Sequence, residues 1–223
     1  DKGSGFANLS DGGQYFNTAT SSMLLIGVSS GMNGYKYRCV ISSTACSDEN
    51  SNEASLTVQT APSISATSGN QSVCSGLNAG FSVTASGTSI TYQWQEDNGG
   101  GFANISNGGI YGGATSSSLT LTGVTATQNG YKYRCVVSGT CSPAATSGDM
   151  SLTVLELPSI SVNPSNATQC ASNNVNFGVT ASGAGITYQW QENTGSGFAN
   201  ITNGGIYGGA TTSTLSLTGV TSG

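Results

Sequence analysis

Apolar and polar residues alternate along several short stretches of this 223-residue chain. In the central part of the sequence, the alternating stretches are 81–85, 90–95, 119–121 and 131–137. A period of two, filled with β-branched and aromatic residues, predicts strands that bury one face. Turns rich in Gly and Asn, such as 98–101 and 107–109, separate the stretches. Since no helical period accompanies them, the pattern predicts an all-β chain built from two-layer sandwiches.

The pattern recurs at an interval of 96 residues. Phe6, Phe102 and Phe198 each stand in the tetrapeptide GFAN, and the same interval separates Trp94 from Trp190. A period of this length is that of a whole domain, whereas solenoid repeats are shorter. The sequence therefore predicts tandem copies of one domain.

The phase of the repeat predicts where the domains begin and end. Strand-like endings at 55–60 and 151–156 run into Pro62 and Pro158, and proline makes a short, stiff joint because it fixes φ and lacks an N–H. We expect the C-terminal part of one repeat at 1–60, a complete repeat at 61–156 and the N-terminal part of a third at 157–223. This phase indicates a section of a longer tandem protein; complementation of partial domains between successive chains is the alternative.

Several residues of the complete repeat resemble the pattern of an immunoglobulin domain. Trp94 stands where that pattern has its core tryptophan, and Tyr133 precedes Cys135 by two residues, as the corner tyrosine of strand F does. Trp190 repeats Trp94 in the third segment. The strand-B cysteine is replaced by Val83, so the usual bridge between the sheets cannot form. We expect Cys135 to face Val83 and Trp94 across the core.

More narrowly, the motifs YQWQ, GFANIS, NGGIYGGAT, LTGVT and NGYKYRCVVSG resemble immunoglobulin-like repeats found in tandem in large surface adhesins and gliding-type filaments of Bacteroidota. That resemblance implies an exported, non-enzymatic protein of the bacterial cell surface, in which the repeats act as stalk or as adhesive array. It implies neighbouring repeats of the same chain, and identical chains in a filament, as partners. A carbohydrate-binding module array attached to a secreted hydrolase is the alternative function.

The six cysteines suggest an oxidising compartment. The complete repeat holds three of them, which permits one bridge and one odd thiol. We favour a disulfide between Cys74 and Cys141, on the expectation that the first and last strand regions pair, with Cys135 as the odd thiol. Bridges from Cys135 to Cys74 or to Cys141 remain open.

Charge and composition exclude several classes of function. The net charge is -5 and the chain contains no His, which disfavours nucleic-acid binding and removes the commonest general base and metal ligand. We predict no catalytic residues, no cofactor and no metal. The two nearest alternatives are a calcium site at Asp48, Glu49 and Glu53, and a carboxylate pair that includes Glu96, which we interpret as a solvated strand end. No stretch is apolar enough over its length to span a membrane.

Aromatic residues in the Gly-rich loops are the candidates for ligand binding. Phe102 and Tyr111, with Phe198 and Tyr207 as their equivalents, could stack on a glycan or another surface ligand. Alternatively, the Phe102 side chain packs into the hydrophobic core. The basic residues Lys36, Arg38, Lys132 and Arg134 alternate with tyrosines, which predicts an outer strand face that pairs with acidic residues on neighbouring strands.

Overall fold

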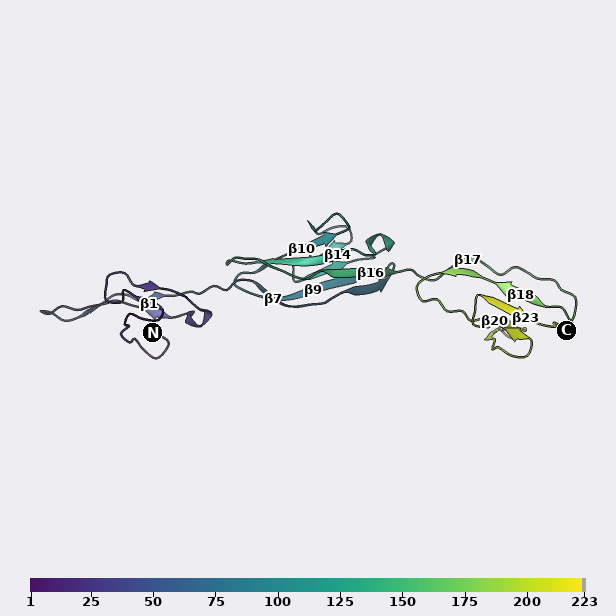
Figure 1. Cartoon of the computed structure of the whole chain (residues 1–223), viewed down its shortest axis with the longest axis horizontal. Coiled ribbons are helices and arrows are strands. Elements are labelled where there is room, and N and C mark those ends of the chain that lie inside the picture. Colours follow the sequence, from purple (N-terminus) through teal and green to yellow (C-terminus); the bar gives the residue numbers. More distant parts are fainter. Residues whose placement is uncertain (222–223) are drawn as a thin grey trace.

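The chain forms three β-rich segments that follow one another along a single direction (Figure 1). The computed structural model describes residues 1–221. Helix is confined, in this part of the chain, to the 3₁₀ turns η1 (Ser30–Met32) and η2 (Ala126–Gln128). No helix among the described residues has the length and apolarity of a membrane span. The all-β prediction is confirmed.

The middle segment consists of two facing sheets. One sheet has the strand order β12-β13-β9-β7 and the other β11-β10-β14-β16-β8, with β15 paired to β14. The strands are β7 (Ser63–Thr67), β8 (Gln71–Cys74), β9 (Ala79–Ser86), β10 (Thr91–Asp97), β11 (Ala103–Asn104), β12 (Tyr111–Gly112), β13 (Ser118–Leu121), β14 (Lys132–Ser138), β15 (Ala145–Thr146) and β16 (Met150–Leu155). Neighbours are antiparallel except for β16 and β8, which run parallel. This is the layout of an immunoglobulin-like sandwich.

The core of the middle segment follows from the alternation of the strands. Every second residue of β14 and β16 is buried, as are Ala79, Phe81 and Val83 of β9. In β10, Trp94 is fully enclosed, with 0% of its surface exposed, and its neighbours are half-buried or exposed. Phe81 and Tyr133 come from opposite sheets and stack with their ring centroids 4.8 Å apart. Val83 also lies on the sheet opposite Cys135, as expected, but Trp94 does not, because it is the register partner of Cys135 on the neighbouring strand.

The first segment contains strands β1 (Tyr15–Phe16), β2 (Leu24–Leu25), β3 (Lys36–Tyr37), β4 (Val40–Ile41), β5 (Glu49–Asn50) and β6 (Ala54–Ser55). The third contains β17 (Ser159–Val162), β18 (Val175–Gly178), β19 (Thr180–Ser182), β20 (Gln191–Asn193), β21 (Phe198–Asn200), β22 (Tyr207–Gly208) and β23 (Thr214–Leu217). Their registers repeat those of the middle segment at an offset of 96. For example, Lys36 pairs with Ser55 as Lys132 pairs with Ser151.

The two flanking segments differ from the middle one in how much of their core is covered. Trp190 is half-buried where Trp94 is enclosed, and residues 187–190 are not a strand, although 91–94 are. The ladder partner of 91–94 is β14, and the described part of the third segment has no equivalent of β14. Strand formation at this position therefore depends on a neighbour that comes late in the repeat.

Candidate functional site

The joints between the segments have the same construction. At the first joint, Thr88 donates its backbone N–H to the carbonyl of Thr60 at 3.0 Å, and Thr60 donates its own N–H to the Thr88 hydroxyl at 2.9 Å. At the second joint, the Ala184 N–H donates to the carbonyl of Glu156 at 3.1 Å. Since Ala184 and Glu156 are the repeat equivalents of Thr88 and Thr60, each preceding segment is tied to the following one at the same place.

A glycine with positive φ makes room for the proline of each joint. Gly87 has φ +147°, and a Cβ built there would lie 3.0 Å from the Cα of Pro62. Gly183 has φ +139°, and its Cβ would lie 2.9 Å from the Cα of Pro158. Contacts this short are rare or absent for real Cβ atoms, so a side chain at either position would crowd the proline. Each joint is therefore a close-packed turn rather than a free linker.

The parallel pair of β8 and β16 connects the two ends of the middle segment. Its register runs from Leu152 opposite Gln71 to Leu155 opposite Cys74. Beyond the strands, Ser75 donates its N–H to the Leu155 carbonyl at 2.9 Å, and the Ser151 N–H donates to the side chain of Asn70 at 2.8 Å. A pull on the two ends of the segment moves parallel strands in opposite directions, so it loads all of these hydrogen bonds together in shear.

The predicted ligand residue Phe102 is not free to stack on a ligand with both faces. The guanidinium carbon of Arg134 lies 3.9 Å from the centroid of the Phe102 ring, and Arg38 lies over Phe6 at 4.3 Å. Arg134 also donates from Nε to Gln95 at 2.8 Å. Phe102 therefore neither packs into the core nor lies free in an open loop. Its ring contacts Arg134 of β14 on the outer face of the sheet.

Phe198, the equivalent ring of the third segment, is 72% exposed. No described residue of the third segment corresponds to Arg134, so this ring has no guanidinium over it. Of the four predicted ligand-loop residues, Phe198 is the one that the structure leaves most open.

The two predicted loop tyrosines are held by carboxylates. Tyr111 donates its hydroxyl to Glu96, and Tyr207 donates to the equivalent Glu192 at 2.5 Å. Burial raises the pKa of Tyr111 well above its ordinary value, and the bond to Glu96 adds to the effect. Tyr133 points into the same region; its buried hydroxyl has no hydrogen-bond partner, and burial raises its pKa even further.

Our interpretation of Glu96 as a solvated strand end was wrong. Strand β10 stays regular through Asp97, so Glu96 shares the inward face of Trp94 and lies half-buried opposite Tyr133. Glu96 is a single carboxylate that is hydrogen-bonded to a tyrosine, as in a structural hydrogen-bond network. A glycosidase instead needs a pair of carboxylates.

The basic residues in and next to β3 and β14 divide into two groups. The lysines pair with acids on the adjacent strand or loop, as expected: Lys36 with Glu53 at 2.9 Å and Lys132 with Asp149 at 4.0 Å. Glu53 and Asp149 are repeat equivalents, so this ion pair recurs. The arginines instead stack on the phenylalanines described above.

The predicted disulfide is not formed, and all six cysteines are free. Strands β8 and β16 do pair, but Cys74 lies at the Leu155 end and Cys141 lies beyond Ser138 at the other. About ten residues of strand, roughly 30 Å at ~3.3 Å per residue, separate these ends, whereas a bridge needs Cα atoms within about 7 Å.

The alternative bridges fail for related reasons. Cys135 lies in the middle of β14 and is fully buried, so about seven residues, roughly 20 Å, separate it from Cys74 along the sheet. Cys141 lies in the turn after β14, outside the core that encloses Cys135. Burial raises the pKa of the Cys135 thiol to about 11.

The calcium alternative finds no support in the geometry. Within residues 1–221, no three His, Cys, Asp or Glu side chains are grouped closely enough to hold a metal ion. Glu53, one of the three candidates, is engaged by Lys36.

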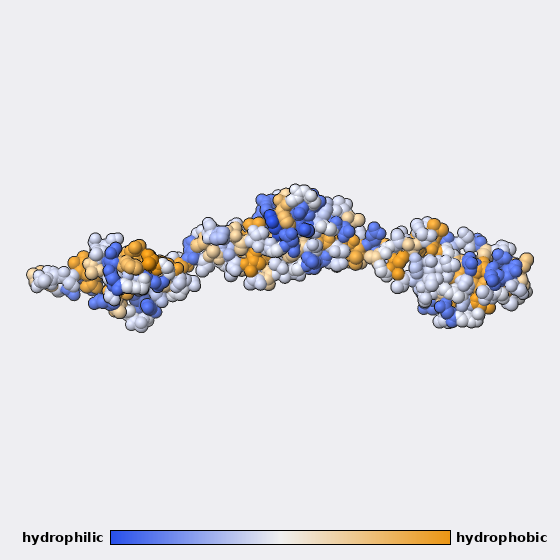
Figure 2. All heavy atoms as spheres, in the orientation of Figure 1, coloured by the Kyte–Doolittle hydropathy of each residue, from blue (hydrophilic) through white to orange (hydrophobic). Residues whose placement is uncertain are grey.

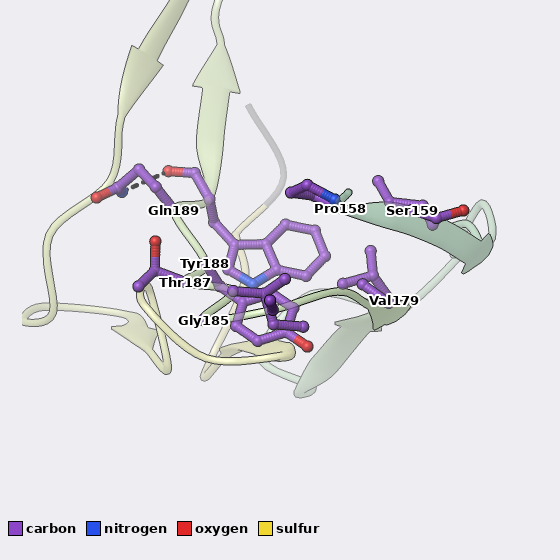
Figure 3. Close-up of a pocket in the computed structure, with 12 residues that line it drawn as sticks. Pro158, Ser159, Val179, Gly185, Thr187, Tyr188 and Gln189 are labelled. Carbon is purple, nitrogen blue, oxygen red and sulfur yellow. Dashed lines mark hydrogen bonds between the residues drawn. The ribbon is translucent and has the colours of Figure 1, made fainter. Parts of the chain in front are cut away.

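The third segment contains a cavity with a volume of about 520 Å³. Figure 3 shows Pro158, Ser159 and Val179 on one side of it, and Thr187 and Tyr188 on the other. Trp190 and Ile160 complete the apolar lining. No sequence pattern pointed to this cavity, because the equivalents of its apolar lining residues in the middle segment form the core or pack against it.

Comparison with known proteins gives a family match over part of the chain and shows the fold. Residues 64–156 match the profile of a family described only as a domain of unknown function, DUF8696. No curated protein matches. Among solved structures, an I-band fragment of titin superposes with a TM-score of 0.62 and 17% identity over 96% of this chain and 75% of that fragment.

Two further solved structures are also fragments of several domains. Immunoglobulin domains 1–5 of Sidekick-1 superpose with a TM-score of 0.53 and 15% identity, over 93% of this chain and 45% of that one. Extracellular domains 3–5 of Drosophila OTK give 0.50 and 17%, over 84% and 62%. At such identities the likeness shows the fold: tandem immunoglobulin-like domains.

Proposed function

We propose that this chain is a non-enzymatic, load-bearing spacer within a long extracellular protein or filament of a bacterial surface. Residues 61–156 are its complete repeat unit, and 1–60 and 157–223 are parts of neighbouring units. The observation that carries this proposal is the parallel pair of β8 and β16, which links the beginning of the middle segment to its end.

Two further features support a spacer. The joints repeat the same hydrogen bond and the same glycine-proline packing, so successive units keep a set direction instead of swinging on flexible linkers. Most candidate catalytic, metal and ligand residues are engaged in structural contacts, namely Glu53, Glu96, Phe102, Tyr111 and Tyr207. The cell-surface location and the relation to Bacteroidota adhesins rest on the motif resemblance.

Single-molecule pulling on the 223-residue chain from its two ends tests the mechanical role. We expect the middle unit to unfold in one event that lengthens the chain by roughly 300 Å, as about 96 residues at ~3.3 Å each require. Ser75→Pro removes the N–H that donates to Leu155 and should lower the force of that event.

Ala103→Pro is the matched control, because β11 lies at the far edge of the same sheet and outside the line of force. An equal loss of force in both variants would contradict the role of the parallel pair. An extension far from 300 Å would instead contradict the unit boundaries. Labelling of intact cells with antibody to residues 61–156 tests the surface location separately.

A further inference from the structure

A row of three polar residues crosses the outer face of one sheet of the middle segment. Arg134 of β14 and Asn104 of β11 are both register partners of Gln95, one on each side of β10. Their side chains point away from the core, because Trp94 and Cys135, the next residues along β10 and β14, are fully buried. The three side chains therefore stand next to one another on the solvent side of the sheet.

The arginine fixes the orientation of both amides in this row. Arg134 donates from Nε to Oε1 of Gln95 at 2.8 Å, and Gln95 donates from Nε2 to Oδ1 of Asn104 at 2.8 Å. A guanidinium has donors only, so Gln95 must turn its oxygen toward Arg134 and its NH₂ group toward Asn104. Asn104 must then accept with its oxygen, which leaves its own NH₂ group pointing away from the row.

The groups left over at the two ends of the row are all donors. Among the described residues, Nε is the only nitrogen of the Arg134 guanidinium with an acceptor, and Nδ2 of Asn104 has none. Asn104 is exposed and Arg134 is half-buried. The two ends lie about 10 Å apart, since neighbouring strands are separated by about 4.8 Å. The row thus presents two separate sets of donors, which select a ligand rich in acceptors.

Arg134 also carries a charge that no carboxylate neutralises at contact distance. Both salt bridges within residues 1–221 are made by lysines, Lys36 and Lys132. The Phe102 ring holds the guanidinium in place, 3.9 Å from the ring centroid. Figure 2 shows strongly hydrophilic residues gathered on the part of the middle segment where Figure 1 draws β10. A guanidinium that is fixed in position and has free donors matches the two oxygens of a carboxylate.

We propose that this row binds an acidic polysaccharide, that is, a chain of sugars that carry carboxylate groups. The free donors of Arg134 receive one carboxylate, and the NH₂ group of Asn104 donates to an oxygen further along the sugar chain. Because the net charge of the protein is -5, this contact holds the ligand without help from a general positive field.

The flat polar face favours a polysaccharide over an acidic peptide. Peptides in extended form bind by pairing with a free sheet edge, and helical peptides bind in apolar grooves. Strands β10 and β14 are paired on both sides, and β11 spans only Ala103–Asn104, so the row offers little backbone to pair with. Recognition here rests on side-chain donors alone.

Parts of the row recur at the 96-residue interval. Arg38 lies over Phe6 at 4.3 Å, and Gln191 donates from Nε2 to Oδ1 of Asn200 at 2.9 Å. A long polymer that reaches several such rows binds more tightly than each row does alone. The inference goes beyond the proposed spacer function and does not depend on it, since the pulling experiment measures β8 and β16 and involves no ligand.

Titration of the 223-residue chain with polygalacturonate, in buffer of low salt without divalent cations, tests the proposal. Nuclear magnetic resonance follows the Nε–H signal of Arg134 and the NH₂ signals of Asn104 and Gln95, so the affinity belongs to this row. We expect saturable shifts of the Arg134 and Asn104 signals. Fully methyl-esterified polygalacturonate has the same sugar chain with its carboxylates blocked, and it should leave these signals in place.

Arg134→Gln should weaken the binding measured at Asn104 by at least roughly tenfold, because it removes the charged fork. Lys132→Gln is the matched control: it removes the same charge two residues away on the same strand, from a side chain that points to Asp149. Binding should persist in that variant, and circular dichroism should be unchanged in both.

Asn104→Asp tests the other end of the row independently of the arginine. The aspartate still accepts from Gln95, but it replaces the outward NH₂ group by an oxygen that repels a carboxylate, so the affinity measured at Arg134 should fall. Absence of shifts at Arg134 and Asn104, or equal shifts with the esterified polymer, would overturn the proposal. So would equal losses in Arg134→Gln and Lys132→Gln, or binding of polyglutamate as tight as that of polygalacturonate, which would assign the row to acidic peptides.

Discussion

Arg134 lies over the ring of Phe102 and so connects β14 to the residue that precedes β11, the two strands on opposite sides of β10. The guanidinium carbon is 3.9 Å from the ring centroid, and the Nε atom donates to Gln95 of β10 between them. The pair stabilises the outer face of this sheet, because an arginine stacked on an aromatic ring keeps its in-plane donors free for hydrogen bonds. Arg38 and Phe6 repeat the arrangement in the first segment.

Arg134→Lys should therefore destabilise the middle unit by about 1 kcal/mol, since lysine keeps the charge but loses the planar stack and the fork of donors. Hydrogen exchange of β14 amides in the full chain measures this. Arg38→Lys is the matched control, because it alters the same contact in another segment. Unchanged exchange at β14 in the Arg134→Lys chain would show that the stack contributes nothing there.

The buried hydroxyl of Tyr133 predicts a dependence on alkaline pH. Burial raises the pKa of Tyr133 and Tyr111, and raises that of Tyr37 to about 12. A group with a raised pKa contributes its full stability below the pKa of the unfolded chain, near 10 for tyrosine, and loses it as pH rises through the folded pKa. The chain should become progressively less stable above pH ~10.

Tyr133→Phe removes a hydroxyl that has no partner, so it should leave stability at pH 7 unchanged or slightly higher and should flatten the alkaline loss. Tyr111→Phe is the contrasting variant. It leaves the Glu96 carboxylate without its donor and should cost about 1 to 3 kcal/mol at pH 7. Urea unfolding at pH 7 and pH 11 compares them, and an equal cost of both variants at pH 7 would contradict the assignment.

The joint glycines predict a change of shape without loss of the sandwich. Gly87→Ala places a Cβ 3.0 Å from Pro62 at φ +147°, so the joint must open. Small-angle X-ray scattering should detect a changed maximum dimension, while circular dichroism stays constant. Gly148→Ala is the control, because its Cβ meets no atom within 4 Å and its φ is not in the positive range. Scattering curves that coincide for both variants would mean that the joint does not depend on this packing.

Cysteine labelling separates the core thiol from the surface thiols. Because burial raises the pKa of Cys135 to about 11, iodoacetamide at pH 8 should spare it in the folded chain. The exposed Cys39, Cys46 and Cys170 should react, and Cys135 should react only after unfolding. Peptide mapping without reductant should find no bridge between Cys74 and Cys141. Such a bridge, if found, would mean that the strand register separating them is wrong.

The fold could be predicted from the sequence because its determinants are local. The alternation in 131–137 follows from the geometry of a strand, and the turns need glycines at positive φ, which the chain supplies at regular places. The 96-residue period then required that the pattern be repeated. Trp94 and Val83 could be placed in the core on the same basis, and both lie in it.

Only the tertiary structure decided which distant residues meet. It put Arg134 over Phe102, turned Glu96 toward Tyr111, and separated Cys74 from Cys141 although the strands beside them pair. The physical reason is that alternation tells which face of a strand is buried, whereas strand order, register and the direction of pairing, which set every distance across the sheets, depend on residues far apart in the chain.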